Sequence, residues 1–361
     1  MIKIQFICPI DGRYFGIMAQ RKSLSSTKKT VNRNASPSAH GWCFQVGAGI
    51  SLMLEYIQDF THLKMEGASD DIEITLGEGK KLYAQAKSVK QIGDQKNAAR
   101  SLSDAIKVLS EDERQGDAFK LVYITNIANP LSSKISSAFQ YGHTYDFSIL
   151  PTDAKKKIID KGGKHFPTDK FQLQIINFFG EGNNKLQSIK EKIEKFLREA
   201  IYDTSYSSLL LKDWFETFMV NAADKPDKDK ENKLNLTKKQ IIFPVIAVII
   251  NPPISDAEFG KVCDYENYSE IEQEFRKTIY EATCDYEFIA NILGDYFEKH
   301  KNALDKTNYR YEFTKNEWQN YEGAFIRISN TDKRQAIIKI LLLTIITRNA
   351  ILDQIKKAVN L

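Results

Sequence analysis

Alternation of apolar and polar residues is strongest between residues 70 and 87 of the chain. Two short segments, residues 70–76 and 80–87, flank the turn Gly77-Glu78-Gly79, and this combination is typical of a β-hairpin. Side chains along a strand point alternately to its two faces, so the polar members of each segment share one face. If the polar faces of the two strands coincide, one side of a small sheet carries Asp71, Glu73, Gln85 and Lys87.

The hydrophobic pattern around this hairpin predicts an α/β domain. Helical spacing of apolar residues alternates with short apolar runs that are bounded by glycine, asparagine or proline. Gly47 and Gly49 lower the helix propensity of the first helix and suit close packing against a neighbouring sheet. The expected fold is a mixed sheet with helices on its faces. We expect a helix over 41–59, the hairpin over 70–89, a helix over 94–110, and strands over 119–126, 145–150 and 170–179.

A second, mainly α-helical region begins at about residue 185. Amphipathic stripes predict helices around 186–197 and 209–220, and alternating charges predict a loop over 221–236. The apolar run 241–250 predicts a strand, and the Ile- and Leu-rich stretch 336–355 predicts a helix that is either central to its domain or buried against a partner. The expected division is a basic arm over 1–40, an α/β domain over 41–182, and a helical assembly or regulatory domain over 185–361.

The composition is that of an ordinary globular protein. The chain has 361 residues, enough for two domains, of which 42% are hydrophobic and 27% charged. A net charge of +4 does not by itself indicate a polyanionic partner. No apolar run has the length of a membrane span, so we expect a cytoplasmic protein without membrane contact. The four cysteines lie far apart, as is typical of reduced thiols: Cys8, Cys43, Cys263 and Cys284.

Basic residues gather at two places. Residues 19–40 contain Lys28, Lys29 and Arg33 and no acidic residue, so this segment is either a solvated terminus or an arm that contacts DNA phosphates. Whether residues 1–17 belong to the native chain stays open. A second group near the hairpin has the charge to follow a DNA backbone, and a solvated face explains it as well: Lys80, Lys81, Lys90, Lys96 and Arg100.

Asp71, Gln85 and Lys87 are the candidate catalytic residues. Phosphodiester hydrolysis needs an in-line water and a cation close to the developing charge. A Mg²⁺ (or Mn²⁺) ion held by Asp71 and the Gln85 amide oxygen would supply that cation, and Lys87 would contact the scissile phosphate or the attacking water. Glu55 on the preceding helix is expected to complete the metal site, with Glu73 as a competing ligand. The alternative is a solvated strand face without catalytic function.

The spacing of these residues resembles a known nuclease motif. Asp71, followed after about a dozen residues by Gln85-x-Lys87, resembles the core of the PD-(D/E)XK nuclease superfamily in its glutamine variant. With residues 41–55 and 123–126 added, the chain is similar over about 38–180 to the double-stranded-DNA endonuclease domain of bacterial anti-phage effectors. That domain occurs in CBASS effectors, in some Avs proteins and as the nuclease subunit of Lamassu systems. The neutral glutamine is a departure from the commoner acidic ligand.

The resemblance implies a fold, an activity and partners. The fold would be restriction-endonuclease-like, and the activity would be metal-dependent cleavage of double-stranded DNA in anti-phage defence. No nucleotide-sensing pattern is recognised in residues 185–361, so the Lamassu nuclease subunit is the closer match. This match implies an SMC-like ATPase partner, a small accessory subunit, and homo-oligomer formation on activation. Two alternatives stay open: a non-catalytic DNA-binding or adaptor subunit, and a stand-alone restriction-type nuclease.

Overall fold

The computed structural model describes two compact units. The first comprises residues up to Phe196 together with Leu211–Lys238, and the second comprises Leu197–Leu210 and Lys239–Leu361. The expected boundary at residue 185 therefore lies inside the first unit. Residues 1–35 of the predicted arm and 224–234 of the predicted loop lie outside the described residues. The described residues are 36–65, 70–93, 98–113, 116–131, 139–223, 235–250, 255–264, 268–283, 285–301 and 308–361.

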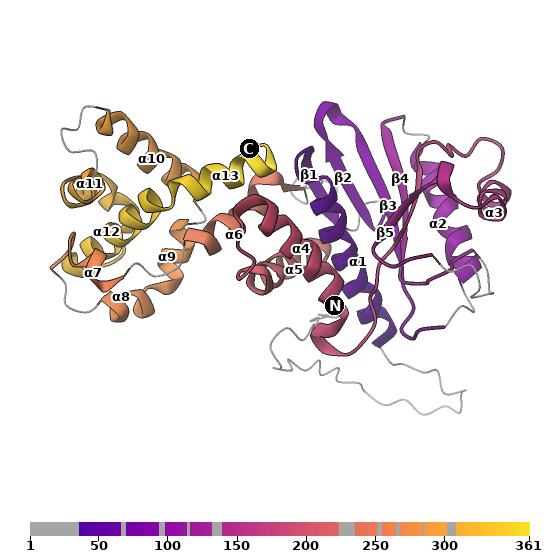
Figure 1. The fold of residues 1–361 in the computed structure, drawn as a ribbon, viewed down its shortest axis with the longest axis horizontal. Helices are drawn as coiled ribbons and strands as arrows, with labels where there is room; N and C mark the ends of the chain where they lie inside the picture. Colours follow the sequence, from indigo (N-terminus) through magenta and orange to yellow (C-terminus); the bar gives the residue numbers. More distant parts are fainter. Residues whose placement is uncertain are drawn as a thin grey trace, which may run out of the picture. The chain divides into compact units, whose positions relative to one another are not determined.

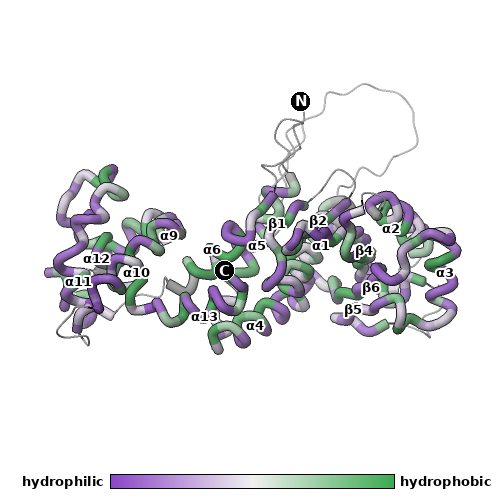
Figure 2. The backbone as a smooth tube through the Cα atoms, turned by 90° about the horizontal axis from the view of Figure 1, so that it is seen from above, coloured by the Kyte–Doolittle hydropathy of each residue, from purple (hydrophilic) through white to green (hydrophobic). Residues whose placement is uncertain are grey.

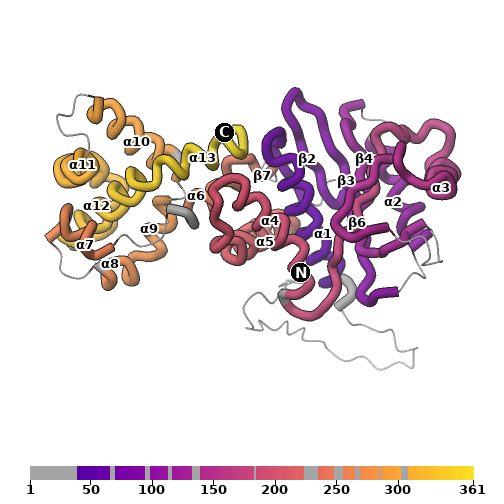
Figure 3. The backbone as a smooth tube through the Cα atoms, viewed as in Figure 1, coloured from indigo at the N-terminus to yellow at the C-terminus, as the bar shows by residue number. Residues whose placement is uncertain are grey.

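The first unit is built on a mixed seven-stranded sheet with helices on its faces (Figures 1 and 3). Residues 197–210, which cluster with the second unit, include the end of α4 and the start of α5. Because each of these helices is continuous, both are described with the first unit. In chain order the elements are α1 (Ser36–Glu55), β1 (Phe60–Met65), β2 (Ile72–Leu76), η1 (Gly77–Gly79), β3 (Lys81–Lys87), α2 (Ala98–Glu113), β4 (Ala118–Thr125), β5 (His143–Asp146), η3 (Phe147–Ile149), α3 (Thr152–Gly162), β6 (Phe171–Ile175), η4 (Gly182–Leu186), α4 (Gln187–Ile201), α5 (Ser207–Ala223) and β7 (Leu236–Thr237).

The sheet has the strand order β5-β6-β4-β3-β2-β1-β7. The strands β1, β2 and β3 form an antiparallel meander, β4 and β6 continue it in parallel, and β5 and β7 add antiparallel edges. The predicted hairpin is confirmed, with Glu73 opposite Tyr83, so the polar faces of its two strands do coincide. Its turn is tight because Glu78 and Gly79 both adopt positive φ angles, of 62° and 73°. The strand β1 was missing from the prediction.

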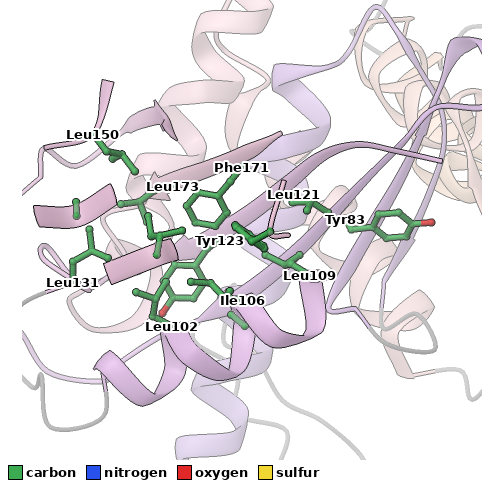
Figure 4. Close-up of a cluster of buried hydrophobic side chains, with 14 of the residues drawn as sticks. Tyr83, Leu102, Ile106, Leu109, Leu121, Tyr123, Leu131, Leu150, Phe171 and Leu173 are labelled. Atoms are coloured by element: carbon green, nitrogen blue, oxygen red, sulfur yellow. The ribbon is translucent and has the colours of Figure 1, made fainter. Parts of the chain in front are cut away.

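A buried cluster fills one face of this sheet. Alternate residues of the parallel strands, among them Tyr83, Tyr123 and Leu173, pack against α2 and α3. Figure 4 shows Leu102, Ile106 and Leu109 of α2 beside the side chains of Leu121, Tyr123 and Phe171 from the sheet. The amphipathic stripe predicted for this helix is therefore the face that it buries.

The helix α1 covers the opposite face of the sheet, where it contacts β1, β2 and β3 (Figure 1). A Cβ atom added at Gly49 would lie 2.8 Å from Met65 Sδ of β1, closer than real side-chain carbons approach. At Gly47 the nearest atoms, in Ile189 and Phe178, lie at 3.5 Å, which is ordinary van der Waals contact. The close approach expected for these glycines is confirmed at Gly49.

The regular elements of the second unit, within its described residues, are all helices. Several of its helices begin at capping side chains, such as Asp285, which accepts a hydrogen bond from Phe288 N, and Asn330, which accepts one from Lys333 N. Its elements are α6 (Lys238–Ile250), α7 (Asp256–Phe259), α8 (Tyr268–Glu274), α9 (Arg276–Thr283), α10 (Tyr286–His300), α11 (Tyr309–Glu317), η6 (Trp318–Phe325), α12 (Thr331–Thr347) and α13 (Asn349–Val359).

The strand predicted over 241–250 is wrong, because these residues belong to the helix α6. Figure 2 colours most of this helix as hydrophobic, and Ile241, Ile242 and Val245 are buried. Apolar residues occupy all sides of such a helix, so the sequence shows neither the period of a helix nor that of a strand. The apolar run 241–250 is longer than the roughly five or six residues typical of a strand, which was the available signal.

The helix α12 is central to the second unit. It is buried continuously from Ala336 to Ile346 and packs against α8, α9, α10, α11 and η6. The prediction of one helix over 336–355 was correct in type, but the helix ends at Thr347 and α13 continues at an angle of 60°. No single helix among the described residues is long and apolar enough to span a membrane.

Candidate functional site

Asp71 lies at a bend just before β2, where its carboxylate reaches the end of β3. Oδ2 accepts a hydrogen bond from Ala86 N at 2.8 Å and another from Lys87 Nζ at 2.9 Å. The last pair of the antiparallel ladder between β2 and β3 is Ile72 with Ala84. The Asp71 carboxylate adds a contact between the two strands beyond that pair. Asp71 is 9% exposed, and the Lys87 side chain is 35% exposed. The structure therefore brings two of the predicted catalytic residues into direct contact.

Gln85 is the third predicted residue, and its partner is one that the prediction missed. Its Nε2 donates a hydrogen bond to Asp70 Oδ1 at 3.1 Å. Both side chains are buried. The bend at Asp71 turns two consecutive carboxylates towards the same three residues of β3, although alternation in a straight strand would have separated them. The signal in the sequence was the acidic pair directly before an apolar strand.

Gln85 and Lys87 point to the face of the sheet that α2 covers. Gln85 pairs with Tyr123, and Lys87 pairs with Thr125, at the carboxyl end of the parallel strands. Tyr123 is a member of the cluster buried by α2. Lys87 is the next residue of β3 on this face after Gln85, and it is the last residue of the strand. The ammonium group is thus held on a rigid strand at the rim of the hydrophobic core, where it remains partly open to solvent.

Glu73, the competing metal ligand, belongs to a separate network towards the hairpin turn. Its Oε1 lies 3.1 Å from Lys81 Nζ, which also lies 3.2 Å from Asp117 Oδ2. Burial would lower the pKa of Lys81, but the hydrogen bonds and charges of Glu73 and Asp117 outweigh it and raise this pKa. Burial, with the bond to Asp117, also raises the pKa of Tyr83 well above its usual range. Because Glu73 lies opposite Tyr83, closer to the hairpin turn than Gln85 and Lys87, it is the weaker candidate ligand.

Glu55 does not join this site, which corrects the prediction. Its carboxylate accepts hydrogen bonds from Thr144 Oγ1 at 3.1 Å and from Gln174 Nε2 at 2.8 Å. Gln174 pairs with Ile124, which pairs with Ala86, so Gln174 points to the face opposite Gln85 and Lys87. The physical reason is that α1 lies across that opposite face and ends beside β5 and β6.

A half-buried lysine accompanies Glu55 on that opposite face. Lys192 of α4 donates to Ser51 Oγ at 2.6 Å, and its Nζ lies 3.9 Å from Glu55 Oε2. Burial lowers the pKa of Lys192, which the charge of Glu55 partly offsets. Ser51 is fully buried within α1 and therefore has no access to a substrate. This cluster is best explained as polar groups that satisfy one another at a helix–sheet junction.

The end of β3 is fixed by main-chain contacts to Asn126, which follows β4. Asn126 is fully buried; its Oδ1 accepts from Val89 N at 2.8 Å and its Nδ2 donates to Val89 O at 2.7 Å. His40 of α1 donates from Nε2 to the same carbonyl at 3.1 Å, and its ring packs edge-on against Phe178. These contacts hold the segment after Lys87 against both β4 and α1.

The predicted DNA-binding residues are only partly described by the structure. Lys28, Lys29, Arg33 and Lys96 lie outside the described residues. Lys90 is exposed three residues after Lys87, and Arg100 is exposed on α2, with its Nε 3.7 Å from Asp104 Oδ2. Lys80 and Lys81 lie at the start of β3, about 20 Å along the strand from Lys87. The sequence suggested that these two lysines lie near the site, but they are too far along the strand to flank Lys87.

The donor set at Asp71 fits a hard divalent cation. Asp71 Oδ2 takes both hydrogen bonds, while no described residue donates to Oδ1. Mg²⁺ is commonly held by one or two carboxylates and keeps waters and substrate phosphates as its other ligands. Within the described residues no group of three His, Cys, Asp or Glu side chains could hold a metal ion. A site here would thus combine Asp71 with the Gln85 amide oxygen, water and phosphate.

Comparisons with known proteins add no assignment to this geometry. No protein-family model, no curated protein and no solved structure matches the chain significantly. Inference about function therefore depends on two things: the contacts among Asp70, Asp71, Gln85 and Lys87, and the resemblance of their spacing to the nuclease motif.

Proposed function

We propose that this protein is a metal-dependent double-stranded-DNA endonuclease, and that it acts as the effector subunit of an anti-phage defence system. The observation that carries the proposal is the contact between Asp71 and Lys87 beside Gln85, from two neighbouring strands. The mixed sheet with helices on both faces is compatible with the restriction-endonuclease-like fold that the motif implies. The defence role, the SMC-like ATPase and accessory partners, and activation by self-association come from the resemblance alone.

Each residue has a definite task in the proposed reaction. Asp71 Oδ1 and the Gln85 amide oxygen would bind Mg²⁺ or Mn²⁺, which when bound polarises the phosphate and lowers the pKa of a water. Asp71 Oδ2 holds the Lys87 ammonium group at 2.9 Å. Lys87 in turn places a positive charge where negative charge develops on the phosphate, or orients the attacking water. Lys90 and Arg100 are the described cations proposed to contact the DNA backbone.

Replacement of Lys87 by alanine tests this proposal. We expect Lys87→Ala to reduce plasmid cleavage in Mg²⁺ by about 100- to 1,000-fold, as for loss of other groups that stabilise transition-state charge. The fold should persist, because Asp71 keeps its bond to Ala86 N and the partly exposed position of Lys87 lets water replace the ammonium group. Cleavage should be measured over a range of protein concentrations, since activation is proposed to need self-association.

Lys81→Ala is the matched control for this experiment. Lys81 lies on the same strand and the same face, and it also pairs with a carboxylate, but at the other end of β3. We expect it to retain cleavage. Equal activity of Lys87→Ala and the wild-type protein would contradict the proposed site. DNA binding without cleavage at any protein concentration, with or without the ATPase, would instead favour a non-catalytic adaptor.

A further inference from the structure

Asp70 makes a contact whose chemistry bears on how Gln85 binds a cation. Asp70 is 4% exposed and Gln85 is 3% exposed, and Gln85 Nε2 lies 3.1 Å from Asp70 Oδ1. An ionised carboxylate only accepts hydrogen bonds, whereas a glutamine amide has a donor end and an acceptor end. The contact therefore selects one of the two orientations of the amide: the nitrogen towards Asp70 and the oxygen away from it.

We propose that Asp70 is a positioning residue that orients the Gln85 amide with its oxygen towards the divalent cation held by Asp71. This inference rests on the proposed function. Only the oxygen of an amide binds Mg²⁺, so an amide that presents its nitrogen contributes nothing to the site. A glutamate at the same position would need no such partner, because its two oxygens are equivalent. Asp70 thus explains how a neutral glutamine serves at this position.

Two possible roles for Asp70 predict different metal affinities when residue 85 is also changed. If Asp70 only orients the amide, its replacement matters with Gln85 and does not matter with a glutamate at position 85. If Asp70 binds the metal itself or supplies negative charge, its replacement weakens binding in both cases. A double-mutant cycle separates these roles, because it isolates the coupling between two residues in contact.

The experiment compares the wild-type protein with Asp70→Leu, Gln85→Glu and the double variant. The affinity for Mn²⁺ and Mg²⁺ is measured by isothermal titration calorimetry without DNA. We expect Asp70→Leu alone to weaken binding about 10- to 100-fold, as for loss of other partners of metal ligands, because leucine offers no acceptor to the Gln85 amide nitrogen. In the Gln85→Glu background we expect no weakening, because the two oxygens of the glutamate are equivalent and either one can face the metal. Weakening of tenfold or more in both backgrounds would overturn the inference.

The controls address folding and the proposed function separately. Thermal unfolding without metal checks each variant, and Asp117→Leu serves as the matched change at a carboxylate just before β4, which accepts a hydrogen bond from Tyr83 OH. If Asp70→Leu alone does not fold, Asp70→Asn in the Gln85→Glu background decides, since the asparagine amide donates to one glutamate oxygen and leaves the other for the metal. A wild-type protein that binds neither ion contradicts the proposed function, whereas binding that Asp70→Leu leaves unchanged overturns this inference alone.

Discussion

The Asp71 carboxylate joins two strands through one oxygen atom. Its bond to Ala86 N is a charge-assisted contact to the main chain, which fixes the start of β2 against the end of β3. Its bond to Lys87 neutralises the charge and holds the ammonium group in one place. A carboxylate that is mostly buried needs such partners, because desolvation without them is costly. The two contacts of Asp71 that shape the site therefore also stabilise the hairpin.

His40 should make stability depend on pH. Burial lowers the pKa of His40 from its ordinary value of 6.5; the positive charges of Lys185 and Lys90 add to this, and the bond to the Val89 carbonyl opposes it. Above pH 6.5 both states are neutral at this residue. As the pH falls through 6.5, the unfolded chain takes up a proton that the folded protein does not, so the free energy of unfolding decreases.

The comparison with His40→Gln measures this contribution. Glutamine keeps an N–H donor for the Val89 carbonyl and has no charge to gain. We expect the free energy of unfolding, from urea titration, to fall more between pH 7.5 and pH 5.5 in the wild-type protein than in His40→Gln. An equal fall in both proteins would show that His40 is protonated alike in the folded and unfolded states.

At the scale of elements, α1 and the hairpin depend on each other through close packing. Gly49 lets α1 approach β1 so closely that a methyl group would meet Met65 Sδ at 2.8 Å. The strand β1 in turn pairs with β2, which positions Asp70 and Asp71. Gly49, although it lies outside the candidate site, therefore contributes to the position of the strand next to Asp70 and Asp71.

Alanine substitutions at the two glycines of α1 isolate this contact. Both gain the same helix propensity, about 1 kcal/mol, but only Gly49→Ala meets an atom closer than van der Waals contact. We expect Gly47→Ala to be more stable than Gly49→Ala by about 1–3 kcal/mol, which is the usual cost of overpacking. The free energy of unfolding of the two variants in urea gives this difference directly, and no difference would mean that Met65 moves aside at no cost.

At the scale of the whole molecule, each unit has its own core. The first is organised around the sheet and α2, and the second around α12. An apolar helix packed by several neighbours has little polar surface to show, so its hydrophobic pattern is nearly continuous. The helix α12 is thus explained by burial within its own unit, and its breadth of apolar surface is not evidence for a partner.

Truncation of a core residue of α12 should destabilise the second unit strongly. Leu342 is fully buried, and Leu342→Ala should lower the free energy of unfolding by about 2–5 kcal/mol through lost burial and the cavity left behind. Ile326→Ala, at an exposed position of the same unit, should change it by about 0.5 kcal/mol or less. Thermal unfolding monitored by circular dichroism would separate the two, and equal effects would contradict the central position of α12.

The sequence by itself determined the elements that show a clear local period. Alternation of polar and apolar residues identified the hairpin of β2 and β3, and with it the shared face of Gln85 and Lys87. Helical spacing identified α2, α4 and α5, and an apolar run identified β4. These assignments succeed because one buried face imposes its period on the local sequence.

Only the tertiary structure decided the long-range placements. It put Glu55 beside Gln174 on the wrong face for the proposed site, made α6 a helix, and turned Asp70 towards Gln85. None of these follows from a local period: the end of a helix, an apolar segment without a polar face and a bend before a strand are each set by what packs against them. The chemistry of the site depends on both kinds of information, since the pattern supplies its residues and packing decides which of them meet.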